Sequence, residues 1–105
     1  MGQGEALVRA RMTELTALCR RFGVRRLELF GSALRDDFDS ATSDLDFLVE
    51  IEPPAGIGYA DAFFGLQEGL EQLFGRSVDL LSFGAVKNPH LLQAIERSKR
   101  SLYAA

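Results

Sequence analysis

Apolar residues recur along this chain with two spacings, one typical of helices and the other typical of strands. In the first quarter of the chain, the apolar residues three or four positions apart are Val8, Met12, Leu15, Cys19 and Phe22. This spacing predicts one amphipathic helix, and Gly23 marks its end because glycine readily adopts the left-handed conformation of a helix cap. Residues 26–30 then alternate between polar and apolar, which predicts a half-buried strand.

The next apolar segments predict a second strand and a second helix. Residues 44–51 are largely apolar and are followed by Pro53 and Pro54, which stop a strand because proline cannot donate a backbone hydrogen bond. Five apolar side chains then share one helical face, namely Phe63, Leu66, Leu70, Leu73 and Phe74. We therefore expect a core-packing helix over residues 59–74 that ends at Gly75.

A last helix is expected near the C-terminal end of the sequence. Asn88 suits the N-cap, Pro89 suits the first turn, and the pattern continues to about Arg97. The apolar residues expected to face inward are Leu91, Leu92 and Ile95. His90 is the only histidine, so a serine–histidine–aspartate triad would depend on it and a zinc cluster would lack a second nitrogen ligand. We expect it to be an exposed residue of the helix start.

Composition indicates a compact globular domain. The chain has 105 residues, of which 47% are hydrophobic and 26% charged, so we expect one domain over residues 1–105. A formal charge of −3 gives no general attraction to nucleic acid. Four arginines form either a local basic patch or a solvated helix end and strand entrance: Arg20, Arg21, Arg25 and Arg26.

The cysteine count and the hydropathy bear on the compartment. Cys19 is the only cysteine, so it cannot form an intrachain disulfide, and its place on an apolar helix face suits a small buried hydrophobe. No apolar stretch approaches the roughly 20 residues of a membrane span. The first residues include the acidic Glu5 and no apolar signal-peptide core. We therefore expect a cytoplasmic protein.

Candidate chemistry is concentrated around the start of the second strand. Asp44 and Asp46 are two positions apart, so in a strand they lie side by side on one face, where they repel each other unless a cation intervenes. Mg²⁺ binds oxygen ligands and shares its remaining sites with phosphates. Gly31 allows a sharp turn and close approach to a phosphate. If Ser32 to Arg35 open a helix, its N–H groups favour an anion, with Arg35 as the phosphate clamp.

Taken together, these residues resemble a known family signature. The parts concerned are Gly31-Ser32, Arg35 and Ser43-Asp44-Leu45-Asp46, and they resemble the signature of the DNA polymerase beta-like nucleotidyltransferases, in particular the minimal nucleotidyltransferase, or MNT, proteins. The signature includes a third aspartate on a later strand, and residues 77–81 with Asp79 resemble that strand. The resemblance extends over nearly the whole chain, from the leading helix to Leu102-Tyr103.

The resemblance implies a two-layer α/β fold. The expected sheet is mixed and has three or more strands, with helices mainly on one face and the aspartates at the open side. Each motif alone has a simpler interpretation: Asp-x-Asp is typical of a solvated strand entrance, glycine–serine of an ordinary turn, and Asp79 of an edge strand's polar face. It is the three together, in this order, that favour a metal–nucleotide site.

The resemblance also implies a reaction. Two Mg²⁺ ions hold a nucleoside triphosphate while a hydroxyl attacks its α-phosphorus and pyrophosphate leaves. Asp44 and Asp46 would bind both ions, and Asp79 would complete the metal that binds the attacking hydroxyl. Ser32 and the Gly31 backbone would contact the β- and γ-phosphates, and Arg35 would offset their charge.

MNT proteins are typically encoded with a HEPN-domain protein as a toxin–antitoxin pair. The resemblance therefore implies an antitoxin that transfers AMP from ATP onto a tyrosine of a HEPN ribonuclease toxin, with which it would assemble. Two alternatives stay open. One is a non-catalytic nucleotide-binding antitoxin or regulator that inhibits its partner by direct contact. The other is transfer to a small molecule such as an aminoglycoside, for which 105 residues contain no recognisable acceptor domain.

Overall fold

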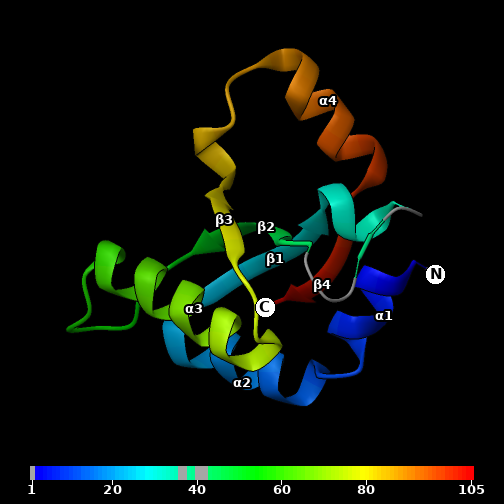
Figure 1. The fold of residues 1–105 in the computed structure, drawn as a ribbon. Coiled ribbons are helices and arrows are strands. Elements are labelled where there is room, and N and C mark those ends of the chain that lie inside the picture. Colours follow the sequence, from blue (N-terminus) through cyan, green and yellow to red (C-terminus); the bar gives the residue numbers. More distant parts are fainter. Residues whose placement is uncertain (1, 36–37, 40–42) are drawn as a thin grey trace.

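The computed structural model describes residues 2–35, 38–39 and 43–105, and it forms a four-stranded sheet with helices mainly on one face (Figure 1). The helices within these residues are α1 (Gln3–Arg9), α2 (Met12–Phe22), α3 (Tyr59–Phe74) and α4 (Pro89–Ser98). The strands are β1 (Val24–Phe30), β2 (Leu45–Ile51), β3 (Val78–Ser82) and β4 (Arg100–Ala104). Two 3₁₀ turns follow β1 and β3, namely η1 (Gly31–Leu34) and η2 (Phe83–Ala85). This arrangement confirms the expected α/β fold.

The sheet is mixed, as expected, and its strand order is β3-β2-β1-β4. β1 pairs antiparallel with both β2 and β4, whereas β2 and β3 are parallel and are connected through α3. Parallel neighbours need such a crossover because the last residue of one strand and the first residue of the next lie at opposite ends of the strands. β4 was not predicted from the apolar pattern, since Leu102 is the only buried residue among its five.

Alternate residues of the strands face two different environments. One face, which we call the covered face, contributes Leu27 and Leu29 of β1 and Phe47 of β2 to the main core under α2 and α3. The Phe47 ring lies 6.3 Å from that of Phe74 on α3. The predicted ends of these two helices are confirmed, because Gly23 and Gly75 cap them with φ values of 73° and 64°. The covered face is thus an apolar layer closed by two helices.

The opposite face, which we call the open face, carries Asp46 of β2 and Asp79 of β3, because side chains alternate along a strand. It also carries a small separate apolar cluster of Phe30, Leu48 and Ile95, the last of which comes from α4. In Figure 1, α4 lies away from α2 and α3 and forms an arch between β3 and β4. The open face is therefore only partly closed by a helix.

The single helix expected up to Gly23 is in fact two helices. α1 ends at Arg9 and α2 begins at Met12, so Val8 belongs to a different helix from the rest of its apolar series. The break lets α1 pack against η1, where Gly4 lies so close to Ala33 that a side chain would collide. Apolar spacing alone could not reveal the break, because the period continues across it.

The last helix begins as expected, but its packing differs. The Asn88 side chain accepts hydrogen bonds from the backbone N–H groups of His90 and Leu91 at 2.9 and 3.3 Å, and Pro89 follows it. Ile95 is buried, whereas Leu91 and Leu92 are 47% and 38% exposed. The prediction that all three face inward is therefore wrong for two of them. Ile95 packs with Phe30 and Leu48 of the sheet, whereas the first turn of α4 contributes no buried residue.

The segment from residue 36 to residue 43 falls partly outside the described residues, which omit positions 36, 37 and 40–42. Within it, Phe38 is only 4% exposed and belongs to the main core. In the part of the chain that the structure describes, no helix is both long enough and apolar enough to cross a membrane.

Candidate active site

Asp46 and Asp79 lie side by side on neighbouring parallel strands. They are direct register partners in the β2–β3 ladder, and their carboxyl groups are hydrogen bonded to each other. Asp46 is half-buried, and Asp79 is exposed because β3 is an edge strand. Burial, followed by the hydrogen bond and negative charge of Asp79, raises the pKa of Asp46 to about 6. Two carboxylates this close repel each other, and a proton or a cation between them relieves the repulsion.

Gly31 begins the turn that borders this pair. Its φ of 74° lies in the left-handed region, and a Cβ at this position would collide with Oδ2 of Asp46. The next residue, Ser32, donates its backbone N–H to the Asp46 carboxylate. Glycine is therefore required here both for the backbone conformation and for the close approach of the turn to Asp46.

Asp44 lies immediately before β2, which begins at Leu45, one residue later than expected. Its side chain is exposed, and its negative charge contributes to the raised pKa of Asp46. The Ser32 hydroxyl donates a hydrogen bond of 3.2 Å to the Asp44 carbonyl oxygen. The Asp44 carboxylate is thus close enough to act on Asp46, although Asp44 stands outside the strand ladder.

The helix considered from Ser32 to Arg35 is only a short 3₁₀ turn, η1. Arg35 follows it in extended conformation and is exposed, with its backbone N–H bonded to the Ser32 carbonyl oxygen at 3.0 Å. A four-residue turn develops little helix dipole, so an anion here would be attracted mainly by local N–H groups and the Arg35 charge. Arg35 is therefore beside the turn, not one turn inside a helix.

The donor set suits a hard divalent cation. Asp44, Asp46 and Asp79 supply carboxylate oxygens, and a pKa of the half-buried Asp46 that is raised by burial and by Asp79 is expected for such a pair without a cation. Among the described residues, no three histidine, cysteine or acidic side chains are gathered into a ready metal-binding group. The residues fit the ion by chemistry, and the two carboxyl groups that meet here bond to each other.

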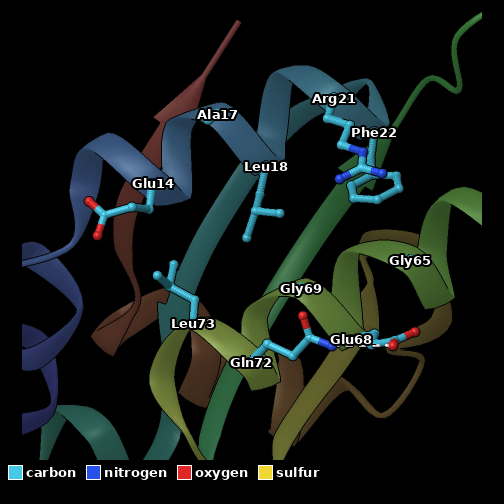
Figure 2. Close-up of a pocket in the computed structure, with 10 residues that line it drawn as sticks. All are labelled: Glu14, Ala17, Leu18, Arg21, Phe22, Gly65, Glu68, Gly69, Gln72 and Leu73. Carbon is cyan, nitrogen blue, oxygen red and sulfur yellow. Dashed lines mark hydrogen bonds between the residues drawn. The ribbon is translucent and has the colours of Figure 1, made fainter.

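A hollow lies elsewhere, between α2 and α3 on the outside of the covered layer (Figure 2). It has a volume of about 780 Å³. The two helices approach closely because Gly65 and Gly69 have no side chains. A side chain at either position would collide with Phe22 or Leu18 respectively. None of the three aspartates lines this hollow. It is a consequence of helix packing and is separate from the candidate active site.

Several residues outside this site match the simpler expectation. Cys19 is buried, and His90 is exposed at the start of α4. Arg25 pairs with Glu52 at 3.7 Å, and Arg26 pairs with Glu50 at 2.9 Å, from successive positions on β1. Each of these two arginines is therefore paired with an acidic side chain, which offsets its charge.

Sequence reasoning missed two contributors near the open face. Arg76 reaches the backbone just before Asp44, and Lys99 pairs with the buried Glu28 at 2.9 Å. Neither residue belongs to a recognisable spacing pattern, since each partner is more than thirty residues away. Only long-range contacts could have identified them.

Comparison with known proteins gives a consistent result. The sequence model of the nucleotidyltransferase domain matches residues 12–102. Protein adenylyltransferase MntA of Thermococcus cleftensis is 37% identical over 84 residues, which cover 80% of this chain and 78% of that protein. A solved structure provisionally described as a minimal nucleotidyltransferase is 34% identical, with a TM-score of 0.68, and the match covers 89% of this chain and 90% of the other.

A more distant structure shares the fold. It is a complex of the tri-AMPylated HEPN toxin of Shewanella oneidensis with an MNT antitoxin. The match has a TM-score of 0.58 at 18% identity and covers 98% of this chain and 74% of the other. At this identity, the likeness shows a common fold.

Proposed function

Because the chain belongs to the nucleotidyltransferase domain family, we propose that it transfers AMP from ATP to a tyrosine of a HEPN-domain toxin and acts as its antitoxin. The observation that carries this proposal is the pairing of Asp46 with Asp79 beside the tight turn at Gly31. The adenylyltransferase name of the 37% identical relative and the AMPylated toxin in the distant complex support the choice of group and partner. A cytoplasmic location and a single domain over residues 1–105 stay predictions.

Asp44, Asp46 and Asp79 are the residues proposed to hold Mg²⁺. When bound, Mg²⁺ supplies the positive charge that offsets the triphosphate and favours a deprotonated attacking hydroxyl. Because metal ligands must be deprotonated, the raised pKa of Asp46 means that cation binding here should strengthen as pH rises. Ser32 contacts two of these aspartates. Its backbone N–H donates a hydrogen bond to the Asp46 carboxylate, and its hydroxyl donates one to the Asp44 carbonyl oxygen.

The nucleotide is proposed to lie against the turn after β1. Because Gly31 has no side chain, the turn lies directly against Asp46, which brings the proposed phosphate contacts of the turn next to the carboxylates. Ser32 and the Gly31 backbone would contact the β- and γ-phosphates, and the exposed Arg35 would offset their charge. These assignments divide the site into a phosphate side at η1 and a carboxylate side at β2 and β3.

The acceptor is proposed to approach from the edge of the sheet. Asp79 is exposed on the edge strand β3, whereas Asp46 is half-buried on an inner strand. A hydroxyl from another protein therefore meets Asp79 first. A tyrosine suits this role because its phenol, with a reference pKa near 10, loses its proton more easily than an aliphatic hydroxyl.

The deciding experiment is co-expression with a HEPN-domain toxin followed by mass spectrometry and a ribonuclease assay. The parent protein should add the mass of AMP to a toxin tyrosine and abolish ribonuclease activity. The double variant Asp44→Ala, Asp46→Ala should do neither, while Glu50→Ala, which alters a carboxylate four residues further along β2, should behave like the parent.

One observation favours the binding-module alternative. Asp44 is exposed, and the described residues include no preformed group of three metal-binding side chains. Under this alternative, the double aspartate variant would still inhibit the toxin completely and the toxin would stay unmodified. That result would show that the protein inhibits the toxin by direct contact and not by AMP transfer.

A further inference from the structure

Arg76 occupies the short connection between α3 and β3, three residues before Asp79. Its Nη1 donates a hydrogen bond of 3.0 Å to the Ser43 carbonyl oxygen, and its Nε donates one of 3.5 Å to the Phe74 carbonyl oxygen. The guanidinium carbon lies 5.5 Å from the centre of the buried Phe38 ring. Arg76 therefore joins the segment that precedes Asp44 to the end of α3.

This connection matters because Asp44 is the least constrained of the three aspartates. Asp46 and Asp79 are held by the β2–β3 ladder, whereas Asp44 lies outside β2 and is exposed. Two side chains hold the backbone around it, one from each side. Ser32 bonds the Asp44 carbonyl oxygen at 3.2 Å, and Arg76 bonds the carbonyl oxygen of the residue before it at 3.0 Å.

A backbone bond completes the connection. The N–H of Leu45 donates to the Ser77 carbonyl oxygen at 3.2 Å, so the entrance of β2 is bonded to both of the residues that precede β3. A guanidinium has a planar set of donors that can bond several acceptors in a fixed arrangement, which a lysine cannot reproduce. The arrangement couples the backbone of Asp44 to the strand that carries Asp79.

We infer that Arg76 is a positioning residue that holds the Ser43–Asp44 backbone so that the Asp44 carboxylate can join Asp46 at a divalent cation. The inference rests on the proposed function only in treating Asp44 as a metal ligand. Groups that orient metal ligands from behind typically change metal affinity by about 10- to 100-fold when removed. Removing Arg76 should therefore weaken cation binding without removing any ligand.

The test measures Mn²⁺ binding by electron paramagnetic resonance, without ATP or partner, in the parent, Arg76→Ala and Arg26→Ala. Arg26 is a matched control because it also bonds an acceptor, Glu50 at 2.9 Å, and lies over a phenylalanine ring, that of Phe83 at 3.9 Å. Arg76→Ala should weaken Mn²⁺ binding by about tenfold. Arg26→Ala should stay within about twofold of the parent, although both variants lose some thermal stability.

Three results would contradict the positioning role of Arg76. Parental Mn²⁺ affinity in Arg76→Ala, equal losses in the two arginine variants, or no Mn²⁺ binding by the parent would each overturn the inference. If Arg76→Ala does not fold, Arg76→Lys replaces it and should weaken binding at least about threefold, since a single ammonium nitrogen cannot reproduce the planar guanidinium fork. If Mn²⁺ binding depends on Arg76 but the protein transfers no AMP, the proposed function is wrong. The positioning role of Arg76 would still hold.

Discussion

The covered and open faces of the sheet are built from alternate residues of the same strands, yet they differ in almost every physical property. On the covered face, Leu27 and Phe47 are fully buried beneath two helices. On the open face, their neighbours Glu28 and Asp46 are acidic, and α4 closes only part of the surface. The comparison shows that one face supplies the stability that allows the other to keep unfavourable charges.

The open face itself contains two contrasting carboxylates. Glu28 is buried and lies 2.9 Å from the Lys99 ammonium, and this hydrogen bond raises the pKa of Lys99. Asp46 instead faces a second carboxylate, Asp79, so its charge has no cationic partner among these neighbours. A buried carboxylate opposite a cation is stabilised, whereas two facing carboxylates favour a proton or a metal ion between them. This contrast identifies Asp46 as the place where a ligand is needed.

The largest expected effect comes from removing that charge. Asp46→Asn should lower Mg²⁺-dependent AMP transfer by about two to three orders of magnitude, while the fold is retained because the site is relieved of repulsion. Initial rates at saturating Mg²⁺ and ATP measure this effect, and Glu50→Gln is the control. Equal rates in the Asn variant and the parent would show that the open face does not carry the chemistry.

Truncating one leucine on each side compares the faces directly. Leu66 of α3 is fully buried on the covered side, and Leu91 of α4 is 47% exposed. Leu66→Ala should lower the free energy of unfolding by about 2–5 kcal/mol because it leaves a cavity, and Leu91→Ala by less than about 0.5 kcal/mol. Urea denaturation measures both. Similar losses would mean that the start of α4 is as tightly packed as the main core.

The pH dependence of stability should distinguish Asp46 from an ordinary surface carboxylate. Its pKa is raised from 3.8 to about 6 in the folded protein, so ionisation destabilises the fold as pH rises between these values. With EDTA present, Asp46→Asn should therefore be more stable than the parent above pH 6, by on the order of 1 kcal/mol for a half-buried group. Thermal unfolding should show this difference vanish below a pH of about 4. A difference that is constant across this range contradicts the explanation.

The smallest effect concerns the closure of the covered face. Burial raises the pKa of the Cys19 thiol to about 12, and the residue belongs to the main core. The native protein should therefore react negligibly with a thiol reagent such as Ellman's reagent at mildly alkaline pH, because the thiolate is the reactive form. Absorbance should report one reactive thiol only after denaturant is added. Rapid reaction of the native protein would indicate frequent opening between α2 and the sheet.

Local features of the sequence predicted much of this molecule. The glycine caps after Phe22 and Phe74 and the Asn88 cap of α4 depend on backbone preferences of single residues, and all three are observed. The order of the Gly31 turn and the strands carrying Asp46 and Asp79 likewise agrees with the resemblance to nucleotidyltransferases. Such features are readable because their physical causes lie within a few residues of chain.

Other features depend on contacts between distant segments. The apolar period that runs through α1 and α2 cannot show where the chain turns, and the apolar stripe of α4 cannot show that Leu91 lies beyond the sheet. The residues of β4 alternate only weakly between buried and exposed, so their own pattern does not predict a strand. β4 forms because it pairs with the free edge of β1. Arg76 reaches Ser43 across thirty-three positions, which no short spacing could indicate.

The sequence by itself therefore determined most of the helices and strands and the residues capable of metal and phosphate chemistry, because these follow from side-chain chemistry and local backbone preference. The tertiary structure alone decided which carboxylates meet. The parallel register of β2 and β3 brings Asp46 and Asp79 into contact, while Asp44 is left outside the ladder and held by bonds from Ser32 and Arg76. Register and long-range hydrogen bonds depend on how the whole sheet closes, so no local pattern can specify them.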